Sequence, residues 1–438
     1  MLATFKKHIE QYFPFIKKGK LLIAVSGGID SVVLAHLAQK LGLDFSLCHC
    51  NFQLRGKESD DDETFVKDLA KKLHVNIFTT SFETEKYAEK SKVSIQVAAR
   101  DLRYNWFYEL IEKHQYNYVL TAHNTNDNLE TFLINLTRGT GLEGLTGIPP
   151  INNKSIRPLL AFSRDEIMMF AIKNGIAWRE DRSNASIKYV RNKIRHKVLP
   201  ILKEVNPNLL ESFKKTLKHL NGSKVIIDDR IQEVSKDILT TENDVIKIDI
   251  QKLNALKNKK SYLYQVLNSY GFTEWNDVLS LIDAQSGKQV FSKTHRLLKD
   301  RVSLILTKND LNSSDNRSYT IKEGAQKITS PIPLIIQDTS QETSDNQNTI
   351  IVDKDLLKFP LHVRKWGYGD YICPIGMEGS KKLSQLFKNK KLSLIDKEKV
   401  WLLTDAQNNI IWVIGMRQDR RFSVLESTIN RLKISYKS

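Results

Sequence analysis

Residues 21–31, Leu-Leu-Ile-Ala-Val-Ser-Gly-Gly-Ile-Asp-Ser, constrain the fold more than any other stretch of this chain. Leu21 to Val25 are consecutive apolar residues, a pattern typical of a strand buried on both faces of a parallel sheet. Apolar residues at helical spacing follow from Val32 to Leu41. The sequence therefore predicts a strand, a short glycine-containing loop and a helix.

The loop between this strand and helix has the composition of a phosphate-binding site. Its glycines let the backbone approach a ligand closely, and the free N–H groups at the start of the helix attract phosphate. The loop lacks the Gly-Lys-Ser/Thr of Walker A and the spacing of the dinucleotide fingerprint. An ordinary tight turn is the alternative, but Ser-Gly-Gly-x-Asp-Ser resembles the pyrophosphate loop of ATP pyrophosphatases, which activate a substrate oxygen by adenylation. The residues expected to bind ATP are Ser26, Gly27, Gly28, Ile29, Asp30 and Ser31.

Strand-like and helix-like segments alternate after the loop. Strands are expected at 44–50, 75–79 and 118–122, and helices at 58–73, 94–114 and 126–137. Such alternation is typical of βαβ units and of a parallel, doubly wound, Rossmann-like α/β sheet. Ligands of these sheets bind beyond the carboxyl ends of the strands, which is where the glycine loop falls.

The remainder of the chain changes character twice. Helical patterns reach about residue 239. From Pro207 onward they are compatible with one or two helices, with a break or kink expected near Asn221-Gly222, and a mixed α+β pattern follows. Residues rich in Ser, Asn, Asp, Gln and Thr then indicate a linker or loose region, after which strand-like runs return. We expect a domain built around the loop at 1–212, a helical or α+β middle domain at 213–308, the linker at 309–350 and a basic, β-containing domain at 351–438.

The charge of the chain favours a nucleic-acid partner. Its formal net charge is +17 and its pI is near 9.5, an excess that an enzyme of small metabolites does not need. No apolar run approaches the roughly 20 residues that span a bilayer, so no membrane association is expected. Three cysteines in so long a chain indicate a reducing compartment, and we expect a cytoplasmic protein.

A second polar cluster, Thr121 to Thr131, directly follows the predicted strand at 118–122. Chain order places His123 and Asp127 at the same sheet edge as the loop. Asp127 and Asp30 together are expected to hold Mg²⁺, which prefers hard oxygen ligands and substrate phosphates. The alternative is a helix N-terminus at which Asp127 or its neighbour caps free N–H groups.

Two arginine pairs lie at helical spacing. Arg100 and Arg103 share one face of the helix expected at 94–114, and Arg191 and Arg195 share a face of a later one. Arginines so spaced are suited to bidentate phosphate contacts, although solvated helix faces are the alternative.

Two further clusters have plainer interpretations. Cys48-His49-Cys50 lacks a second pair at metal-ligand spacing, so a packed strand is expected there. The last 88 residues contain seventeen Lys or Arg and nine acidic residues, and aromatic residues such as Trp366, Tyr368 and Tyr371 are interspersed among them. This mixture suits RNA phosphates and stacked bases, the alternative being a basic domain with its aromatics in the core.

Taken in order, the motifs resemble those of the tRNA(Ile)-lysidine synthetase family, within the PP-loop ATP pyrophosphatase superfamily. Beyond the loop they are Leu54-Arg55-Gly56, Ala99-Arg100-x-x-Arg103-Tyr104, His123-Asn124-x-x-Asp127-x-x-Glu130-Thr131, the glycine-rich stretch Arg138 to Ile148, Asp181-x-Ser183-Asn184 with Arg191-Asn192-x-Ile194-Arg195, and a C-terminal stretch from Gly369 to Gly415. Many adenylating enzymes share the loop, but the later motifs in this order are specific.

The resemblance implies a ligase that forms a carbon–nitrogen bond on the wobble cytidine of a CAU-anticodon isoleucine tRNA. The cytosine 2-oxo oxygen attacks the α-phosphorus of ATP, pyrophosphate leaves, and the ε-amine of free L-lysine then displaces AMP to form lysidine. It implies Asp30 and Asp127 as catalytic, Mg²⁺-holding residues and His123 as a further ATP contact. The candidates for holding ATP, lysine or tRNA are Arg55, Arg100, Arg103, Arg191 and Arg195. It also implies that 1–212 is the catalytic domain and that the domains at 213–308 and 351–438 bind tRNA. A homodimer is compatible with the sequence.

The chain departs from the family pattern at two positions. Phe52 stands where the family commonly has histidine, so a role for that histidine does not carry over. Asn126 stands where the family often has the first of two acids, which leaves Asp127 to carry any metal role.

Three competing functions are weaker. A tRNA thiolase on the same loop relies on cysteines near the site, and Cys48 and Cys50 lack the expected spacing. An amidotransferase needs a glutaminase domain or an ammonia source, and none is evident. A non-catalytic tRNA-binding protein has no need of acids beside a phosphate loop.

Overall fold

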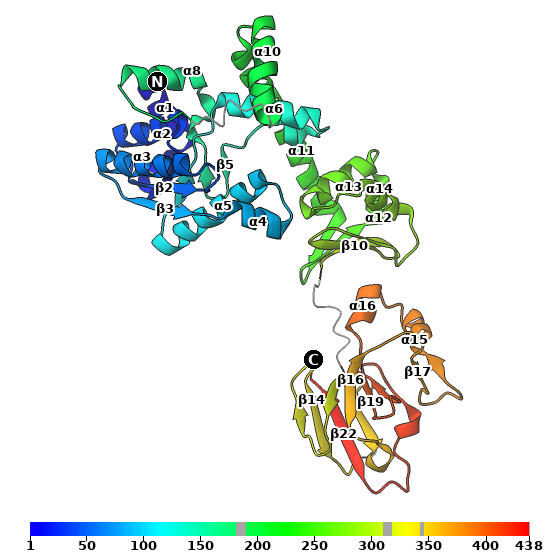
Figure 1. Ribbon diagram of the computed structural model, residues 1–438. Coiled ribbons are helices and arrows are strands. Elements are labelled where there is room, and N and C mark those ends of the chain that lie inside the picture. The colour runs from blue at the N-terminus through cyan, green and yellow to red at the C-terminus, as the bar shows by residue number, and fades with distance from the viewer. Residues whose placement is uncertain (181–189, 310–317, 342–345, 438) are drawn as a thin grey trace. The chain divides into compact units, whose positions relative to one another are not determined.

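The computed structural model describes residues 1–180, 190–309, 318–341 and 346–437 (Figure 1). By its internal contacts the chain divides into two compact units, Met1–Asp229 and Arg230–Ser438. Among the described residues, no helix has the length and apolar character that crossing a membrane requires.

A six-stranded sheet forms the centre of the first unit, in the order β3-β2-β1-β4-β6-β5. Its strands are β1 (Leu21–Ala24), β2 (Phe45–Asn51), β3 (Ile77–Ser81), β4 (Tyr118–Leu120), β5 (Ile151–Asn152) and β6 (Ser155–Ile156). The pairs β1–β2, β2–β3, β1–β4 and β4–β6 are parallel, and the edge pair β5–β6 is antiparallel. The strand order reverses between β1 and β4, and their carboxyl ends flank the point at which such sheets bind ligands.

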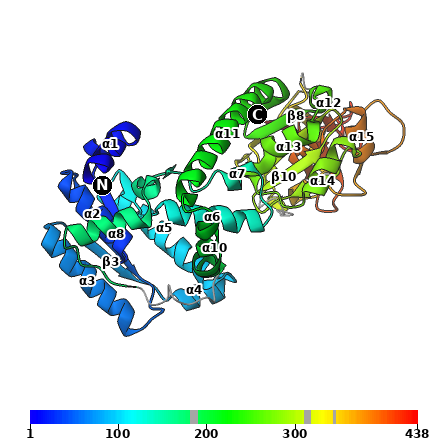
Figure 2. The ribbon, with the colours of Figure 1, turned by 90° about the horizontal axis from the view of Figure 1, so that it is seen from above.

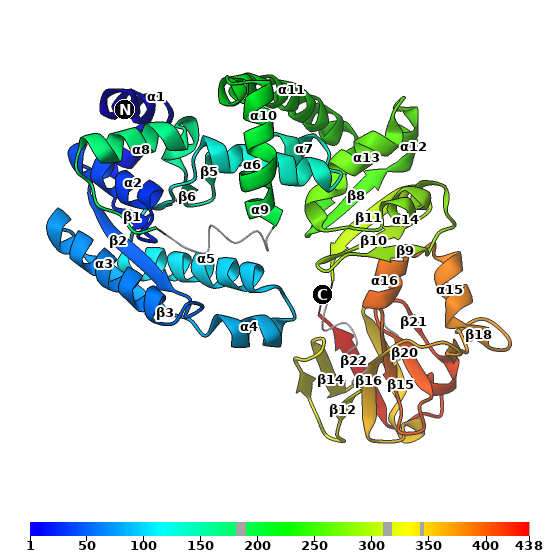
Figure 3. The same cartoon turned by 45° about the horizontal axis from the view of Figure 1, so that its top comes forward.

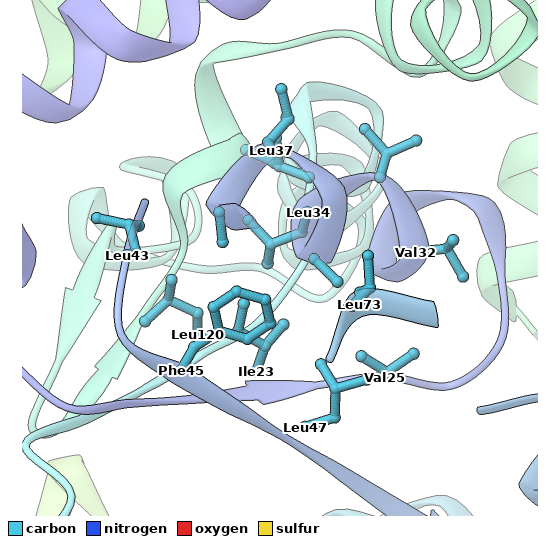
Figure 4. Packing of buried hydrophobic residues seen from close by; sticks show 14 of the residues in the cluster. Ile23, Val25, Val32, Leu34, Leu37, Leu43, Phe45, Leu47, Leu73 and Leu120 are labelled. Carbon is cyan, nitrogen blue, oxygen red and sulfur yellow. The ribbon is translucent and has the colours of Figure 1, made fainter. Parts of the chain in front are cut away.

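Helices cover both faces of this sheet, which explains the unbroken apolar run of β1. On one face of the sheet, Leu21 and Ile23 are buried in a core to which four helices contribute. On the other face, Leu22 packs with Phe107. The first face is covered by α1 (Leu2–Tyr12), α2 (Ile29–Lys40), α3 (Lys57–Leu73) and α8 (Arg164–Lys173), the second by α5 (Ile95–His114). Figure 3 shows α2 and α8 on one side and α5 on the other, and Figure 4 shows Leu34 and Leu37 of α2 packed with Ile23 and Phe45. The predicted α/β class is confirmed.

A smaller helical cluster follows the sheet in sequence. Leu129, Ile194, Leu199 and Phe213 form its apolar centre. The cluster consists of α6 (Thr125–Thr137), α9 (Val190–Lys193), a π-helical turn (Ile194–Val198), α10 (Leu199–Val205) and the start of α11 (Leu209–Ile238). The first unit also contains α4 (Thr84–Ser91), α7 (Leu142–Leu145) and two 3-10 turns, Pro14–Lys18 and Pro158–Ala161.

The expected break near Asn221-Gly222 is wrong, because α11 is one continuous helix of 30 residues (Figure 2). Asn221 Nδ2 donates to Leu217 O over 2.8 Å, within the helix itself. A glycine inside a helix costs about 1 kcal/mol relative to alanine, which a helix of this length tolerates.

The second unit begins with a five-stranded sheet in the order β7-β8-β11-β10-β9, as expected for an α+β middle domain. Its strands are β7 (Leu239–Glu242), β8 (Val245–Asp249), β9 (Gln289–Phe291), β10 (His295–Lys299) and β11 (Ser303–Lys308). Three helices share its core: α12 (Ile250–Ala255), α13 (Lys259–Leu267) and α14 (Trp275–Ser280).

The rest of the second unit is built mainly from two antiparallel sheets, in the orders β12-β16-β19-β20-β21 and β13-β14-β22-β15. Their strands are β12 (Tyr319–Ile321), β13 (Lys327–Ile328), β14 (Leu334–Asp338), β15 (Thr349–Asp353), β16 (Leu361–Lys365), β19 (Trp401–Thr404), β20 (Ile410–Val413), β21 (Arg417–Gln418) and β22 (Arg431–Tyr436). A small hairpin, β17 (Tyr371–Ile372) with β18 (Lys381–Lys382), and the helices α15 (Leu383–Asn389) and α16 (Leu394–Lys399) complete it. The predicted β-containing C-terminal domain is present.

The prediction of a loose linker over 309–350 is wrong for the part that the structure describes at 318–341. Ile321, Leu334 and Ile336 are buried in the same core as Trp412. The strands there are short and place polar residues outward, so the polar composition of the segment concealed them. The β-rich fold therefore starts near residue 319 rather than at 351.

Candidate active site

The glycine loop is held in shape by its own two serines. Ser31 Oγ donates to Gly28 O over 2.9 Å and accepts from Ser26 N at 3.2 Å. Gly28 N in turn donates to Ser26 Oγ at 3.3 Å. Gly27 has a φ of +89°, a conformation that favours glycine. The loop therefore presents the first amides of α2, which have no partner within the helix, at the carboxyl edge of the sheet.

Asp30, in the first turn of α2, accepts hydrogen bonds from two distant segments. Asn124 Nδ2 donates to Asp30 Oδ1, and Arg164 Nη1 donates to Asp30 Oδ2; the donor–acceptor distance is 3.0 Å in both hydrogen bonds. Burial raises the pKa of the Asp30 carboxyl; Arg164 opposes this effect, and the nearby charge of Asp127 adds to it. The two acids expected from sequence are thus electrostatic neighbours.

Asp127 has the capping role that the sequence left open, and it has a further contact as well. It closes a capping box, because its N–H donates to Asn124 Oδ1 over 3.0 Å and its Oδ2 accepts from Asn124 N over 3.1 Å. Its other oxygen, Oδ1, accepts from Arg195 Nη2 at 3.3 Å. Asp127 therefore caps α6 and still directs one carboxylate oxygen away from the helix.

His123 lies just before α6, with its ring Nδ1 3.1 Å from Thr121 Oγ1. Burial lowers the pKa of His123 to about 4. The ring is therefore neutral at pH 7, and it contacts a ligand as a hydrogen-bonding group rather than as a cation.

Glu130 is the buried centre of a charged network one turn further along α6. Its side chain is 1% exposed and accepts from Arg191 Nε at 3.0 Å and from Arg195 Nε at 2.6 Å. Arg191 also reaches Thr131 Oγ1 at 2.9 Å. Arg191 and Arg195 therefore point inward, toward α6, and the solvated helix face suggested for them does not apply.

A second buried acid, Asp62 on α3, organises another pair of arginines. Its Oδ2 accepts from Arg55 Nη2 over 2.9 Å, and its Oδ1 accepts from Arg179 Nε. The backbone N–H of Arg179 donates to Gly27 O over 3.0 Å, which ties the segment before residue 181 to the glycine loop. Two guanidinium groups are thus fixed beside the loop.

These groups line one cavity of about 1020 Å³ in the first unit. Eleven of the residues proposed from sequence line it: Ser26, Gly28, Ile29, Asp30, Ser31, Arg55, Arg103, His123, Asp127, Arg191 and Arg195. Gly27, whose φ is positive, is not among the lining residues. Arg100 lies outside the lining, exposed, with its guanidinium 4.8 Å from the centre of the Tyr104 ring. The motif residues Asp181, Ser183 and Asn184 lie outside the described part of the chain.

Sequence reasoning missed several lining residues, among them Asp62, Arg164, Trp178 and Arg179. For Arg164 one local signal existed. Ser163-Arg164-Asp165-Glu166 has the form of a capping box, which the structure contains, and it predicts a helix start at this place. Nothing local predicts that the first side chain of that helix contacts Asp30, 134 residues away.

Both departures from the family pattern have a structural explanation. Phe52 packs against Phe82, with ring centroids 5.9 Å apart, and the guanidinium of Arg103 lies 5.6 Å from the Phe52 ring. Asn126 Oδ1 accepts from Arg164 N over 3.0 Å, so this side chain fixes the start of α8.

The cysteines at the site are unreactive by environment. Cys48 and Cys50 pack in the cluster that contains Leu22 and Phe107, whereas His49 Nδ1 is 2.8 Å from Val25 O. Burial raises the pKa of both thiols, that of Cys50 to about 12. A protonated thiol is a poor nucleophile. The packed-strand interpretation of Cys48-His49-Cys50 is confirmed.

Asp30 and Asp127 are suited to hold Mg²⁺ jointly with a substrate. No group of three or more His, Cys, Asp or Glu side chains suitable for a metal occurs among the described residues. Asp30 and Asp127 offer two hard carboxylates beside a phosphate-binding loop, the donor set that Mg²⁺ uses when phosphates complete its coordination.

Comparisons with known proteins cover the whole chain. Three family models match: a PP-loop domain at residues 1–202, a TilS substrate binding domain at 241–309 and a TilS substrate C-terminal domain at 361–434.

Curated relatives agree with these models. The tRNA(Ile)-lysidine synthase of Parabacteroides distasonis is 37% identical over 100% of both chains, and that of Bacteroides thetaiotaomicron 36% over 96% of both. The tRNA(Ile)-lysidine synthase of Bacillus subtilis is 28% identical over 100% of this chain and 98% of its own. The glycine loop, the acids at the sheet edge and a likeness that extends from end to end lead to one conclusion: this chain belongs to the tRNA(Ile)-lysidine synthase family.

Proposed function

We propose that this protein ligates free L-lysine to C2 of the wobble cytidine of a CAU-anticodon isoleucine tRNA, consuming ATP and releasing AMP and pyrophosphate. One observation carries the proposal: a single cavity is lined by a glycine loop, four carboxylates and six arginines, in a chain that matches tRNA(Ile)-lysidine synthases over its full length.

The first step is adenylation of the base. The cytosine 2-oxo oxygen attacks the α-phosphorus, and the bond to pyrophosphate breaks. The N-terminal amides of α2, presented by Ser26–Ser31, stabilise negative charge that develops on the phosphates. When bound by Asp30, Asp127 and the phosphates, Mg²⁺ would add positive charge at the same place.

The second step is attack of lysine on C2 of the adenylated base, with AMP as the leaving group. The ε-amine has a pKa of about 10.4, so only about one molecule in 10³ is uncharged at neutral pH. A group in the cavity must therefore take its proton, and the carboxylates that line the cavity are Asp30, Asp62, Asp127 and Glu180. The lysine carboxylate requires a cation, for which the cavity offers its arginines.

The tRNA substrate suits the rest of the chain. A wobble base lies in a single-stranded loop, so splaying it into a cavity costs less than flipping it from a duplex. In the basic C-terminal region Tyr368 is fully exposed, so its ring is available for stacking on RNA. Tyr371 is 47% exposed, with the guanidinium of Arg421 5.6 Å from its ring centre.

The direct test is incorporation of labelled lysine into a transcript of the isoleucine tRNA, with and without ATP. We expect ATP-dependent label on the wobble cytidine and none on an elongator methionine tRNA, which has the same anticodon. Pyrophosphate release without label on either tRNA would mean that the loop is correctly interpreted and the substrate is not.

A tRNA substrate and three cysteines that form no disulfide both agree with a cytoplasmic location. A homodimer stays a prediction, which light scattering on the purified protein would decide.

A further inference from the structure

Arg164 is the cation in closest contact with the acid of the glycine loop, and its position is fixed from several directions. Its backbone N–H donates to Asn126 Oδ1, and Ser163 before it closes a capping box with Glu166. Thr125 Oγ1 donates to Leu160 O and Thr125 N donates to Phe162 O, both at 2.9 Å. These hydrogen bonds hold the turn before α8 against α6. The first residue of α8 is therefore rigidly placed at the cavity wall.

The side chain of Arg164 has more hydrogen-bond donors than acceptors around it. Nη1 donates to Asp30 Oδ2, and the side chain remains 37% exposed in the cavity lining. Within the described residues, neither Nε nor Nη2 has an acceptor at hydrogen-bond distance. A guanidinium is a planar fork of five donors, so most of its hydrogen-bonding capacity faces the cavity.

The remaining arginines near the loop are engaged differently. Arg191 and Arg195 are bound to the buried Glu130, and Arg55 and Arg179 to Asp62. Arg103, the other arginine of the lining, lies with its guanidinium 5.6 Å from the centre of the Phe52 ring and does not contact the acid of the loop. A triphosphate carries several negative charges, and this loop contains no lysine to meet them. A cation attached to the loop acid itself, with donors to spare, is the group best placed to supply that charge.

We propose that Arg164 is a triphosphate-binding residue, oriented by Asp30 and by the Asn126 contact that fixes its backbone. Asp30 then orients this arginine in addition to its part in metal binding, because each of its oxygens keeps a lone pair beyond the hydrogen bonds it accepts. The inference rests on the ATP site of the proposed function and adds to it a residue that no motif in the sequence identified.

The test is nucleotide binding by calorimetry to the full-length protein and its Arg164→Ala variant, without tRNA or lysine. We expect ATP to bind about 10- to 100-fold more weakly to R164A, the range for loss of charge-assisted hydrogen bonds. Adenosine, which has no phosphates, should bind the two proteins within about twofold of each other. The loss for ATP should persist in EDTA, since the contact is to phosphate and not through a metal.

Lys203→Ala is the matched control, because Lys203 is a neighbouring cation that pairs weakly with Asp165 at 4.0 Å and lies outside the cavity lining. It removes the same charge and should leave ATP affinity unchanged. Arg164→Gln, which keeps most of the side-chain volume, replaces R164A if that variant unfolds.

Three results would overturn the inference: equal losses for ATP and adenosine, which indicate a structural role; a loss that disappears in EDTA, which indicates action through the metal at Asp30; or unchanged ATP affinity. Failure of the wild-type protein to bind ATP at all would instead refute the proposed function, so the two failures are distinguishable.

Discussion

The Glu130→Gln variant tests whether a buried ion network holds the arginine side of the cavity together. Glu130 is 1% exposed and accepts three hydrogen bonds from guanidinium groups, one from Arg191 at 3.0 Å and two from Arg195 at 2.6 and 3.0 Å. Glutamine has nearly the same shape, so the change removes the charge and one acceptor oxygen but leaves no cavity.

The expected loss of stability follows from burial. Breaking a buried ion pair by removing one partner costs about 3–5 kcal/mol, because the remaining charge stays buried. Here the side chains of Arg191 and Arg195 are 41% and 24% exposed, so water solvates part of the charge left behind. We therefore expect α6 and α9 to lose about 2–3 kcal/mol of local stability.

Hydrogen exchange read by mass spectrometry measures this locally, without requiring that the whole chain unfold in one step. Amides of Thr125–Thr137 should exchange roughly 30- to 150-fold faster in E130Q, while those of β1 and β2 should be little changed. Asp68→Asn, which breaks an exposed pair with Lys71, is the control and should change exchange by less than about threefold. Unchanged protection of α6 in E130Q would refute the argument that the network is structural.

Three further predictions follow from other contacts. Asp127→Ala should abolish ATP-dependent modification of the tRNA while filter binding shows tRNA affinity nearly unchanged; full activity would remove the metal assignment. Gly147→Ala should lower the free energy of unfolding by roughly 2–4 kcal/mol, because φ is +81° and a Cβ would lie 2.4 Å from Asn128 Oδ1. Gly139→Ala, with φ +71° and no atom within 4 Å, should cost only about 1 kcal/mol, and equal costs in urea unfolding would contradict this reasoning. Because the pKa of His123 is about 4 when folded and about 6.5 when unfolded, the unfolded state binds the extra proton between these pH values, and stability should fall as the pH falls through that window. His123→Asn should reduce that slope in unfolding measured at pH 5 and pH 7.

The features that the sequence predicted correctly are those set by neighbouring residues. The buried strand β1, the glycine loop and the start of α2 all depend on contiguous patterns, and the parallel order of strands follows from their alternation with helices. The glycine loop and the residues around Asp127 could be brought to one edge because parallel strands share their carboxyl ends. The strands within 319–338 were not predicted from the composition of this segment, because polar residues alternate there with buried ones.

The contacts that could not be predicted join residues far apart in the chain. Asp62 accepts hydrogen bonds from Arg55 and Arg179, which lie 7 and 117 positions away from it in the sequence. No local sequence pattern predicts either contact. The same holds for Arg164 and Asp30. Charge alone does not predict which residues form ion pairs, because 67 Lys or Arg and 50 Asp or Glu residues allow very many combinations. The packing of the folded chain determines which of them come into contact.

The two departures from the family pattern differ in what they change. An aspartate at position 126 would accept the Arg164 N–H as the asparagine does, so the loss of that acid leaves the start of α8 intact and removes one negative charge from the edge of the site. Asp127, which caps α6 and reaches Arg195, is then the acid of α6 that remains free to work with Asp30. Phe52 instead replaces a polar ring by an apolar one, and the guanidinium of Arg103 lies against it. An arginine over an aromatic face keeps its in-plane donors available to a ligand, so the substitution preserves a cation at the cavity wall although it removes a histidine.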